Sequence, residues 1–119
     1  MAYIYETKDS GQRAEFDSGM VRDINDGKPR FSLCLADGVP YDEQLLTRWA
    51  MLMERGRIKY GLRNWQNADS QEELDRFRDS ALRHMMQWIC GEDDEDHAAA
   101  VCFNLLGAEY VKRKLDNPS

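Results

Sequence analysis

The sequence predicts an all-α protein, a bundle of three main helices preceded by an irregular N-terminal arm. Three observations predict it. Apolar residues recur at three- and four-residue intervals over 45–53 and again over 74–89. Ser70 followed by Glu73 is a capping-box pattern, which marks the start of a helix. Residues 98–108 are almost all apolar or small, which is typical of a buried helix.

The first predicted helix follows Tyr41. Its apolar positions place one stripe on a helix of roughly four turns, and they are Leu45, Leu46, Trp49, Leu52 and Met53. Gly61 is expected to end this helix, and the polar string RNWQNAD that follows is expected to form a loop.

The second predicted helix begins after Ser70 and ends at Gly91. Its stripe consists of Leu74, Phe77, Ala81, Met85, Trp88 and Ile89.

The third predicted helix begins within the acidic run and continues to about Leu115. Carboxylates in its first turn and basic residues in its last would complement the helix dipole. A helix that is apolar on all sides is buried on all sides, and three helices of this size cannot bury one of their number. The sequence therefore predicts a homodimer or homotetramer, with this helix near the interface.

Residues 1–40 have weak periodicity and are interrupted by glycines. They predict an irregular arm with a short strand or turn around Phe31–Leu35. The arm is expected to belong to the same domain as the helical region, residues 41–119.

Composition limits the classes of function. Of the residues, 42% are hydrophobic and 32% charged, and the formal net charge is −6. An acidic chain has no general attraction for nucleic acid or anionic membranes. Three cysteines without a CxxC pair suggest neither a disulfide framework nor structural zinc. With no signal-peptide pattern and no apolar stretch of ~18 residues, the expected location is cytoplasmic.

The run GEDDEDH, from Gly91 to His97, is the strongest candidate for chemistry. Consecutive carboxylates repel one another, and only a cation or full solvation relieves the repulsion. The run also leads into the most apolar segment of the chain. At ~100° per residue, Asp93, Asp96, His97 and Asn104 would share one helix face, which would suit Mg²⁺. A solvated acidic helix terminus is the alternative, and both interpretations stay open.

Other candidates lie on the first two helices. Glu54 lies away from the apolar stripe, so it is either solvated or turned toward the third helix. His84 borders the second stripe and is either a hydrogen-bonded core residue or part of the site. The loop after the first helix combines cations, an amide and aromatic rings suited to phosphate and base; its members are Lys59, Arg63, Asn64 and Trp65.

Several mechanisms are excluded by missing patterns. GxxxxGK[ST] and GxSxG motifs are absent, and there is no His-Asp pair of the HD type. No basic face indicates a DNA-binding module.

Two long strings, ERGRIKYGLRNW and SALRHMMQWICGEDDEDHAAAVCFNLL, resemble the phage-associated dATP/dGTP diphosphohydrolase family, which is related to the MazG-type all-α pyrophosphatases. The arm GQRAEFDSGMVRDINDGKPRFSL is also similar to that family. The resemblance implies metal-dependent cleavage between the α and β phosphates, and cytoplasm of the host if the chain is phage-encoded. MazG-type enzymes usually carry an ExxE-type and an ExxD-type pair. Here Glu54 stands alone, while Glu92 with Glu95 and Asp93 with Asp96 have the i, i+3 spacing.

The resulting hypothesis is a hydrolase that converts a nucleoside triphosphate, with purine dNTPs (dATP/dGTP) favoured, to the monophosphate and pyrophosphate. Roughly one to three Mg²⁺ or Mn²⁺ ions would be held by carboxylates, namely Glu54, Glu92, Asp93, Glu95 and Asp96, with Glu54, Glu95 and Asp96 as catalytic residues. Substrate contacts are assigned to Lys59, Arg63, Asn64, Trp65, His84, Asn104, Arg22, Lys28 and Arg30. The alternatives are a non-catalytic acidic phage protein that binds a host protein, and a dNTP-binding sensor.

Overall fold

The computed structural model describes residues 5–24 and 27–118. The chain divides into two compact units, and the boundary in the sequence falls between Phe31 and Ser32. Each unit is described by itself.

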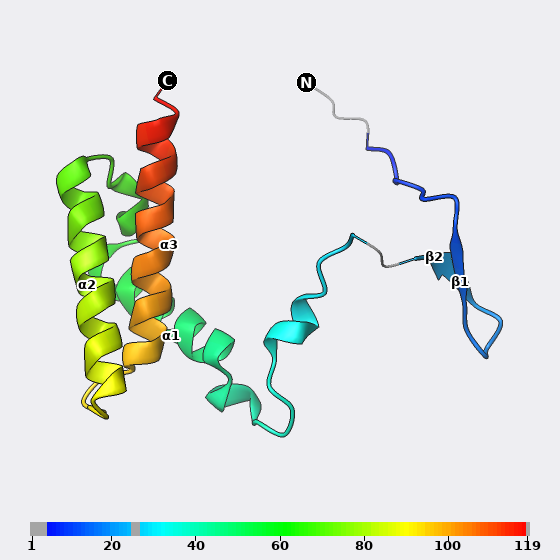
Figure 1. Ribbon diagram of the computed structural model, residues 1–119, viewed down its shortest axis with the longest axis horizontal. Coiled ribbons are helices and arrows are strands. Elements are labelled where there is room, and N and C mark those ends of the chain that lie inside the picture. The colour runs from blue at the N-terminus through cyan, green and yellow to red at the C-terminus, as the bar shows by residue number, and fades with distance from the viewer. Residues whose placement is uncertain (1–4, 25–26, 119) are drawn as a thin grey trace. The chain divides into compact units, whose positions relative to one another are not determined.

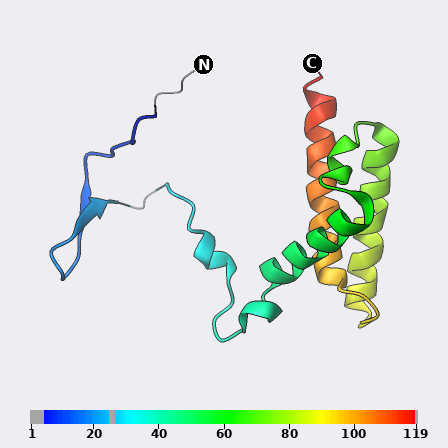
Figure 2. The same cartoon turned by 180° about the vertical axis from the view of Figure 1, so that it is seen from behind.

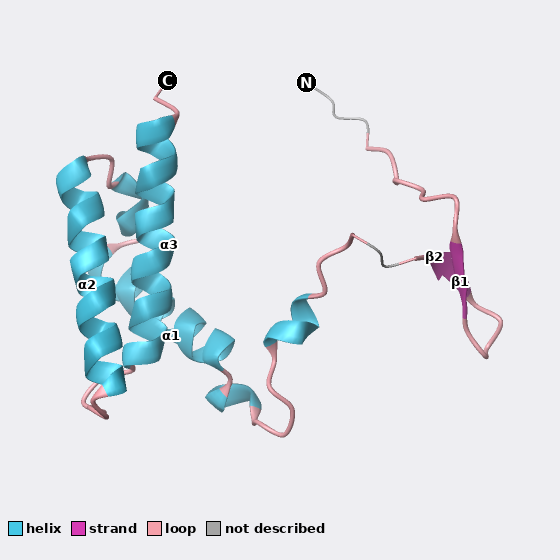
Figure 3. Cartoon of the chain, in the orientation of Figure 1, coloured by secondary structure: helices cyan, strands magenta, loops and turns pink. Residues whose placement is uncertain are grey.

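The N-terminal unit contains a small hairpin (Figure 3). Strands β1 (Arg13–Glu15) and β2 (Val21–Asp23) pair in antiparallel register. Gly19, at φ 90°, supports the connecting turn. The sequence predicted an irregular arm, because strands of three residues are too short to show alternation. The strand or turn expected around Phe31–Leu35 is a 3₁₀ helix, η1 (Phe31–Cys34).

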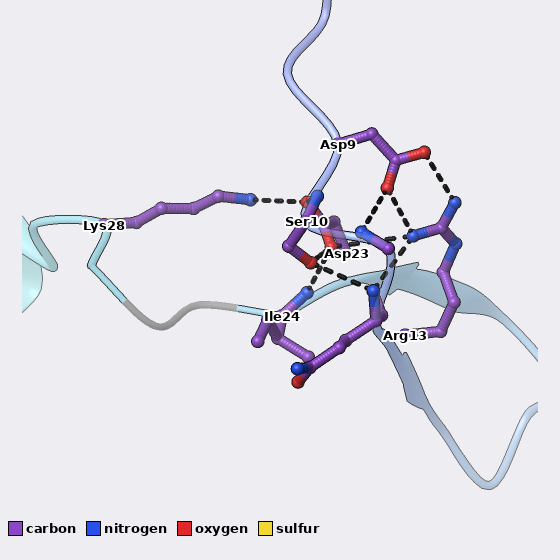
Figure 4. A network of polar contacts seen from close by, with 8 residues as sticks. Asp9, Ser10, Arg13, Asp23, Ile24 and Lys28 are labelled. Atoms are coloured by element: carbon purple, nitrogen blue, oxygen red, sulfur yellow. Dashed lines mark hydrogen bonds and ion pairs between the residues drawn. The ribbon is translucent and has the colours of Figure 1, made fainter.

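A polar network fastens this hairpin to the residues around it (Figure 4). Asp23 accepts hydrogen bonds from the Ser10 backbone N–H at 3.0 Å and from the Ser10 hydroxyl. Arg13 donates two hydrogen bonds to Asp9, at 2.8 and 2.9 Å, and these lower the pKa of Asp9 to about 2. The Nζ atom of Lys28 lies 3.8 Å from Oδ2 of Asp23. Exposed hydrogen bonds and ion pairs therefore hold the hairpin, and none of residues 5–24 is buried.

The second unit is helical, as the sequence predicted. Helix α2 (Gln71–Ile89) runs beside α3 (His97–Asp116) (Figure 1). Helix α1 (Leu45–Tyr60) packs on α3 and lies obliquely across the pair (Figure 2). Two 3₁₀ turns, η2 (Tyr41–Glu43) and η3 (Asn64–Asn67), flank α1. Within the described residues, no helix is both long and apolar enough to span a membrane.

Both ends of α1 have a local cause. The buried side chain of Gln44 receives a hydrogen bond from the Ala36 N–H at 2.9 Å and donates to the Ala36 and Val39 carbonyls at 2.8 and 2.9 Å. These bonds tie the preceding segment to the start of the helix. Gly61 adopts φ 98° at the other end, so the predicted terminus is confirmed.

Helix α2 begins with the predicted capping box, in which the Ser70 hydroxyl accepts from the Glu73 N–H. Its inner face starts with Leu74, Phe77 and Ala81, as expected. It then continues through His84 and Gln87, while Met85, Trp88 and Ile89 are exposed. The predicted apolar stripe therefore turns outward in the last two turns.

The capping carboxylate of Glu73 makes stability depend on pH. Hydrogen bonds from the Asp69 N–H and from Ser70 lower its pKa, so its contribution is present above the unfolded pKa of about 4.3 and is lost as pH falls. We expect Glu73→Gln to lower the free energy of unfolding at pH 6, with the difference shrinking below pH ~4. Urea unfolding across this pH range measures it. Glu72→Gln, which removes a charge from the same turn without these bonds, is the control; equal losses in both variants would contradict the prediction.

The third helix begins later than predicted. The acidic run is a loop, and α3 starts at His97 with Asp96 as its N-cap, accepting from the Ala99 N–H at 3.1 Å. Aspartate is favoured at this capping position because its side chain satisfies an orphan N–H. Asp93 therefore does not share a helix face with His97 and Asn104, and that expectation was wrong.

The core of this unit lies between α2 and α3, with Ala68 of the preceding loop. Leu74, Ala108 and Val111 are buried there, and Phe77 packs against them. Gly107 permits this approach, because a Cβ at this position would lie 2.4 Å from the Phe77 ring.

We expect Gly107→Ala to lower the free energy of unfolding by about 1–3 kcal/mol, because the ring must leave its position. Gly56→Ala is the matched control. A Cβ at Gly56 meets nothing within 4 Å, so that change should raise the same quantity by about 0.5–1 kcal/mol. Denaturant unfolding of both variants measures the contrast, and equal effects would contradict the packing described.

Candidate functional site: a pocket beside the loop between α2 and α3

A pocket of about 540 Å³ lies among the three helices, beside the acidic loop. Each helix contributes polar side chains to it, and the loop contributes carboxylates. The polar residues that line it include Arg55, Arg83, His84, Glu95, Asp96 and Asn104. Cationic and anionic groups therefore meet in one cavity, which is suitable for an anionic ligand accompanied by a cation.

Asp96 is held in place by Arg48 of α1. The guanidinium donates from Nε to Oδ2 at 2.9 Å and from Nη2 to Oδ1 at 3.1 Å. This hydrogen bonding, opposed by partial burial, lowers the pKa of Asp96. With the helix-capping bond added, Asp96 receives three donors and connects α1 to the start of α3.

A histidine pair lies at the base of the acidic loop. The Nδ1 atoms of His84 and His97 are 2.9 Å apart, and both side chains are buried. On the other side of the ring, His97 Nε2 lies 2.8 Å from Oδ1 of Asp94. Burial is the largest cause of the lowered pKa of His84. The bond with His97 is the largest cause of the lowered pKa of Asp94.

Asn104 is the buried amide of α3. Its Nδ2 donates to the Ala100 carbonyl one turn earlier, at 2.8 Å. A buried amide needs such a partner, and this bond turns the side chain along its own helix at the wall of the pocket.

A second pocket, of about 840 Å³, adjoins the first and is more apolar. The two share Leu52, Arg55, Tyr60 and Phe103 as lining residues. Four of the predicted substrate residues line the larger pocket together with Glu54, and they are Lys59, Arg63, Asn64 and Trp65. Trp49 also lines it, and among the residues that the structure describes its buried Nε1–H has no hydrogen-bond partner. Such a donor can bind a polar ligand atom.

The predicted carboxylate ligands fall into three groups. Glu54 is exposed on α1 and pairs with Arg57, whose Nη2 lies 2.6 Å from Oε1. Glu92 and Asp93 are exposed in the loop and line neither pocket. Glu95 and Asp96 line the smaller pocket. Their assignment as metal ligands stays a prediction.

Three predicted phosphate-binding residues belong to the other unit. Arg22 lies in β2, Lys28 is near Asp23, and Arg30 is exposed. Their proposed role also stays a prediction.

Sequence reasoning missed three arginines of the site, Arg48, Arg55 and Arg83. Arg48 and Arg55 are seven residues apart on α1, a spacing that places both on one helix face. That spacing was available in the sequence. The apolar stripe beside it dominates the pattern of α1 and gives no sign that the two arginines matter.

The fold and the pocket define a small all-α protein that presents arginines and carboxylates to one polar cavity. The model of the family described as dATP/dGTP diphosphohydrolase, N-terminal, matches residues 18–117. The chain belongs to this family, as the resemblance implied. No curated protein and no solved structure matches the chain significantly.

Proposed function

We propose that the protein is a metal-dependent nucleoside triphosphate pyrophosphohydrolase that converts purine dNTPs to dNMP and pyrophosphate. The observation that carries the proposal is the smaller pocket, where Arg55 and Arg83 accompany Glu95. Guanidinium groups match phosphate oxygens, and carboxylates match divalent cations. Membership of a diphosphohydrolase family supports the same chemistry.

The two adjoining pockets suggest that different parts of the substrate bind in different pockets. The smaller pocket takes the triphosphate, with Arg55 and Arg83 as its cations. The larger, apolar pocket takes the base and sugar beside Trp65 and Asn64. Arg55 lines both pockets and thus lies where the two parts of a nucleotide would join. Lys59 and Arg63 add positive charge to the lining of the larger pocket.

The donor set fits Mg²⁺ or Mn²⁺, since carboxylate oxygens are the ligands these ions take. Glu95 is the foremost ligand of the proposal, because within the described chain its carboxylate makes no hydrogen bond or ion pair. Asp96 is oriented by Arg48, and Glu54, Glu92 and Asp93 complete the proposed set. When bound, the ions neutralise phosphate charge and activate a water molecule. Whichever carboxylate of this set does not contact an ion would serve as the general base for that water.

The proposal is tested with a panel of dNTPs and NTPs in Mg²⁺ or Mn²⁺, with identification of the products. We expect dNMP and pyrophosphate, with a purine dNTP turned over fastest. Release of inorganic phosphate in place of pyrophosphate would contradict the bond assignment. Inactivity toward the whole panel, combined with thermal stabilisation by a dNTP, would mean a binding protein.

Self-association is part of the proposal. Four apolar residues of α2 at i, i+3, i+4 and i+7 form a second stripe, which faces away from α3; they are Leu82, Met85, Met86 and Ile89. Three of them are more than half exposed. Contiguous apolar surface of this kind is typical of an interface. This α2 stripe, and not the third helix as the sequence suggested, is the proposed contact between copies in a homodimer or homotetramer.

A further inference from the structure

The pair formed by His84 and His97 is an unusual arrangement for two buried side chains. They come from different helices, are 8% and 2% exposed, and their Nδ1 atoms lie 2.9 Å apart. The ring centroids are 5.1 Å apart and the planes are tilted by 41°. The rings therefore meet through their nitrogen atoms rather than by stacking.

Asp94 decides which nitrogen of His97 carries the proton. A carboxylate can only accept, so the 2.8 Å contact with Asp94 assigns the hydrogen to His97 Nε2. Neutral His97 then presents the Nδ1 lone pair to His84. Either a proton from His84 or another positive charge must lie between the two Nδ1 atoms, since two facing lone pairs repel.

Glu95 supplies a third ligand at the same place. One of its carboxylate oxygens and one nitrogen from each ring all lie within 4.8 Å of one another. Nitrogen ligands at ~2.0–2.1 Å from a tetrahedral ion are about 3.3 Å apart. The two rings would therefore have to separate by a few tenths of an ångström and turn until both Nδ1 lone pairs point at the ion. Glu95 is exposed and the histidines are buried, so an ion here would keep open positions toward solvent.

We infer that His84, His97 and Glu95 form a binding site for a divalent transition-metal ion of the Zn²⁺ or Co²⁺ type. Two imidazoles and a carboxylate suit such ions, whereas Mg²⁺ takes oxygen ligands. Asp94 is the positioning residue, because a carboxylate on the outer ring nitrogen fixes the tautomer of a metal-bound histidine. The site goes beyond the proposed hydrolase and does not depend on it.

Zn²⁺ binding to the full chain tests the inference, measured by calorimetry at neutral pH without nucleotide. We expect one tightly bound ion per chain, and retained binding in the presence of excess Mg²⁺. Glu95→Gln, an exposed change that preserves the fold, should weaken binding at least about tenfold. Asp94→Asn should weaken it about 10–100-fold, and His84→Gln more.

Two controls separate this site from other Zn²⁺ ligands. Cys90→Ser removes the exposed thiol nearest in sequence to Glu95, and it should leave affinity unchanged. The chain has only two histidines, so Co²⁺ should shift both sets of ring signals in a proton NMR spectrum. Absence of Zn²⁺ binding, loss of binding in Cys90→Ser alone, or unchanged affinity in folded His84→Gln and Glu95→Gln would each overturn the inference.

Failure of this inference is distinguishable from failure of the proposed function. Zn²⁺ affinity is measured without substrate, and Mg²⁺-dependent hydrolysis is measured by its products. A chain that binds Zn²⁺ at the histidines but hydrolyses nothing overturns only the hydrolase. A chain that hydrolyses dNTPs but ignores Zn²⁺ overturns only this site.

Discussion

Replacement of Glu95 by Gln is expected to lower kcat for dNTP hydrolysis by at least about 100-fold, the scale of losing a group that stabilises transition-state charge. Glu95 lines the pocket that also holds Arg55 and Arg83. Glutamine keeps the size of the side chain and removes only the charge. Because Glu95 is exposed in the loop, helix content should be unchanged. Steady-state kinetics and circular dichroism together measure the result.

Glu109→Gln is the matched control, because Glu109 is exposed on α3 and lines neither pocket. We expect its kcat to equal that of the parent. Asp96→Ala is a poorer test, since it removes the α3 cap and the Arg48 contact at the same time. Activity of Glu95→Gln within about threefold of the parent would show that Glu95 takes no part in the chemistry.

The C-terminus of α1 and the N-terminus of α2 could be predicted because they depend on local chemistry. The Ser70–Glu73 capping box and the left-handed Gly61 are each complete within a few residues of sequence. The hairpin of the first unit could not be predicted in this way. Its strands are only three residues long, and the hydrogen bond from Ser10 to Asp23 joins residues that are distant in sequence.

The acidic run shows where periodicity misleads. Asp96 has helix-forming neighbours on its C-terminal side, so extending the helix backward through Asp93 was consistent with the sequence alone. The start of α3 is set by the Asp96 side chain capping Ala99 and by Arg48 binding from α1. The second of these contacts is tertiary, and no pattern within the run encodes it.

The candidate site was predictable in composition but not in its pairings. His84 and Asn104 were selected as single polar residues beside apolar stripes, and both line the smaller pocket. The pairing of His84 with His97 requires α2 and α3 to pack with these two residues side by side. The alignment of the two helices along their length follows from side-chain packing, including the approach of Gly107 to Phe77.

A charge placed in the α2 stripe is expected to separate the copies of the chain. Met86 is 55% exposed at the centre of this stripe. In an oligomer it would be buried, and an unpaired carboxylate in an apolar interface is strongly unfavourable. We therefore expect the parent to exceed its chain mass of 13.9 kDa in solution and Met86→Glu to run as a monomer. Light scattering coupled to size exclusion measures both masses.

Asn67→Glu adds the same charge at an exposed position outside the stripe, and it should keep the mass of the parent. The stripe faces away from α3, so a folded Met86→Glu monomer should retain the pocket residues and their contacts. Its activity then shows whether one chain suffices: a folded but inactive monomer would mean that the partner helps to complete the site. A parent of monomeric mass at every concentration, or a Met86→Glu variant of unchanged oligomeric mass, would mean that this stripe is not the contact.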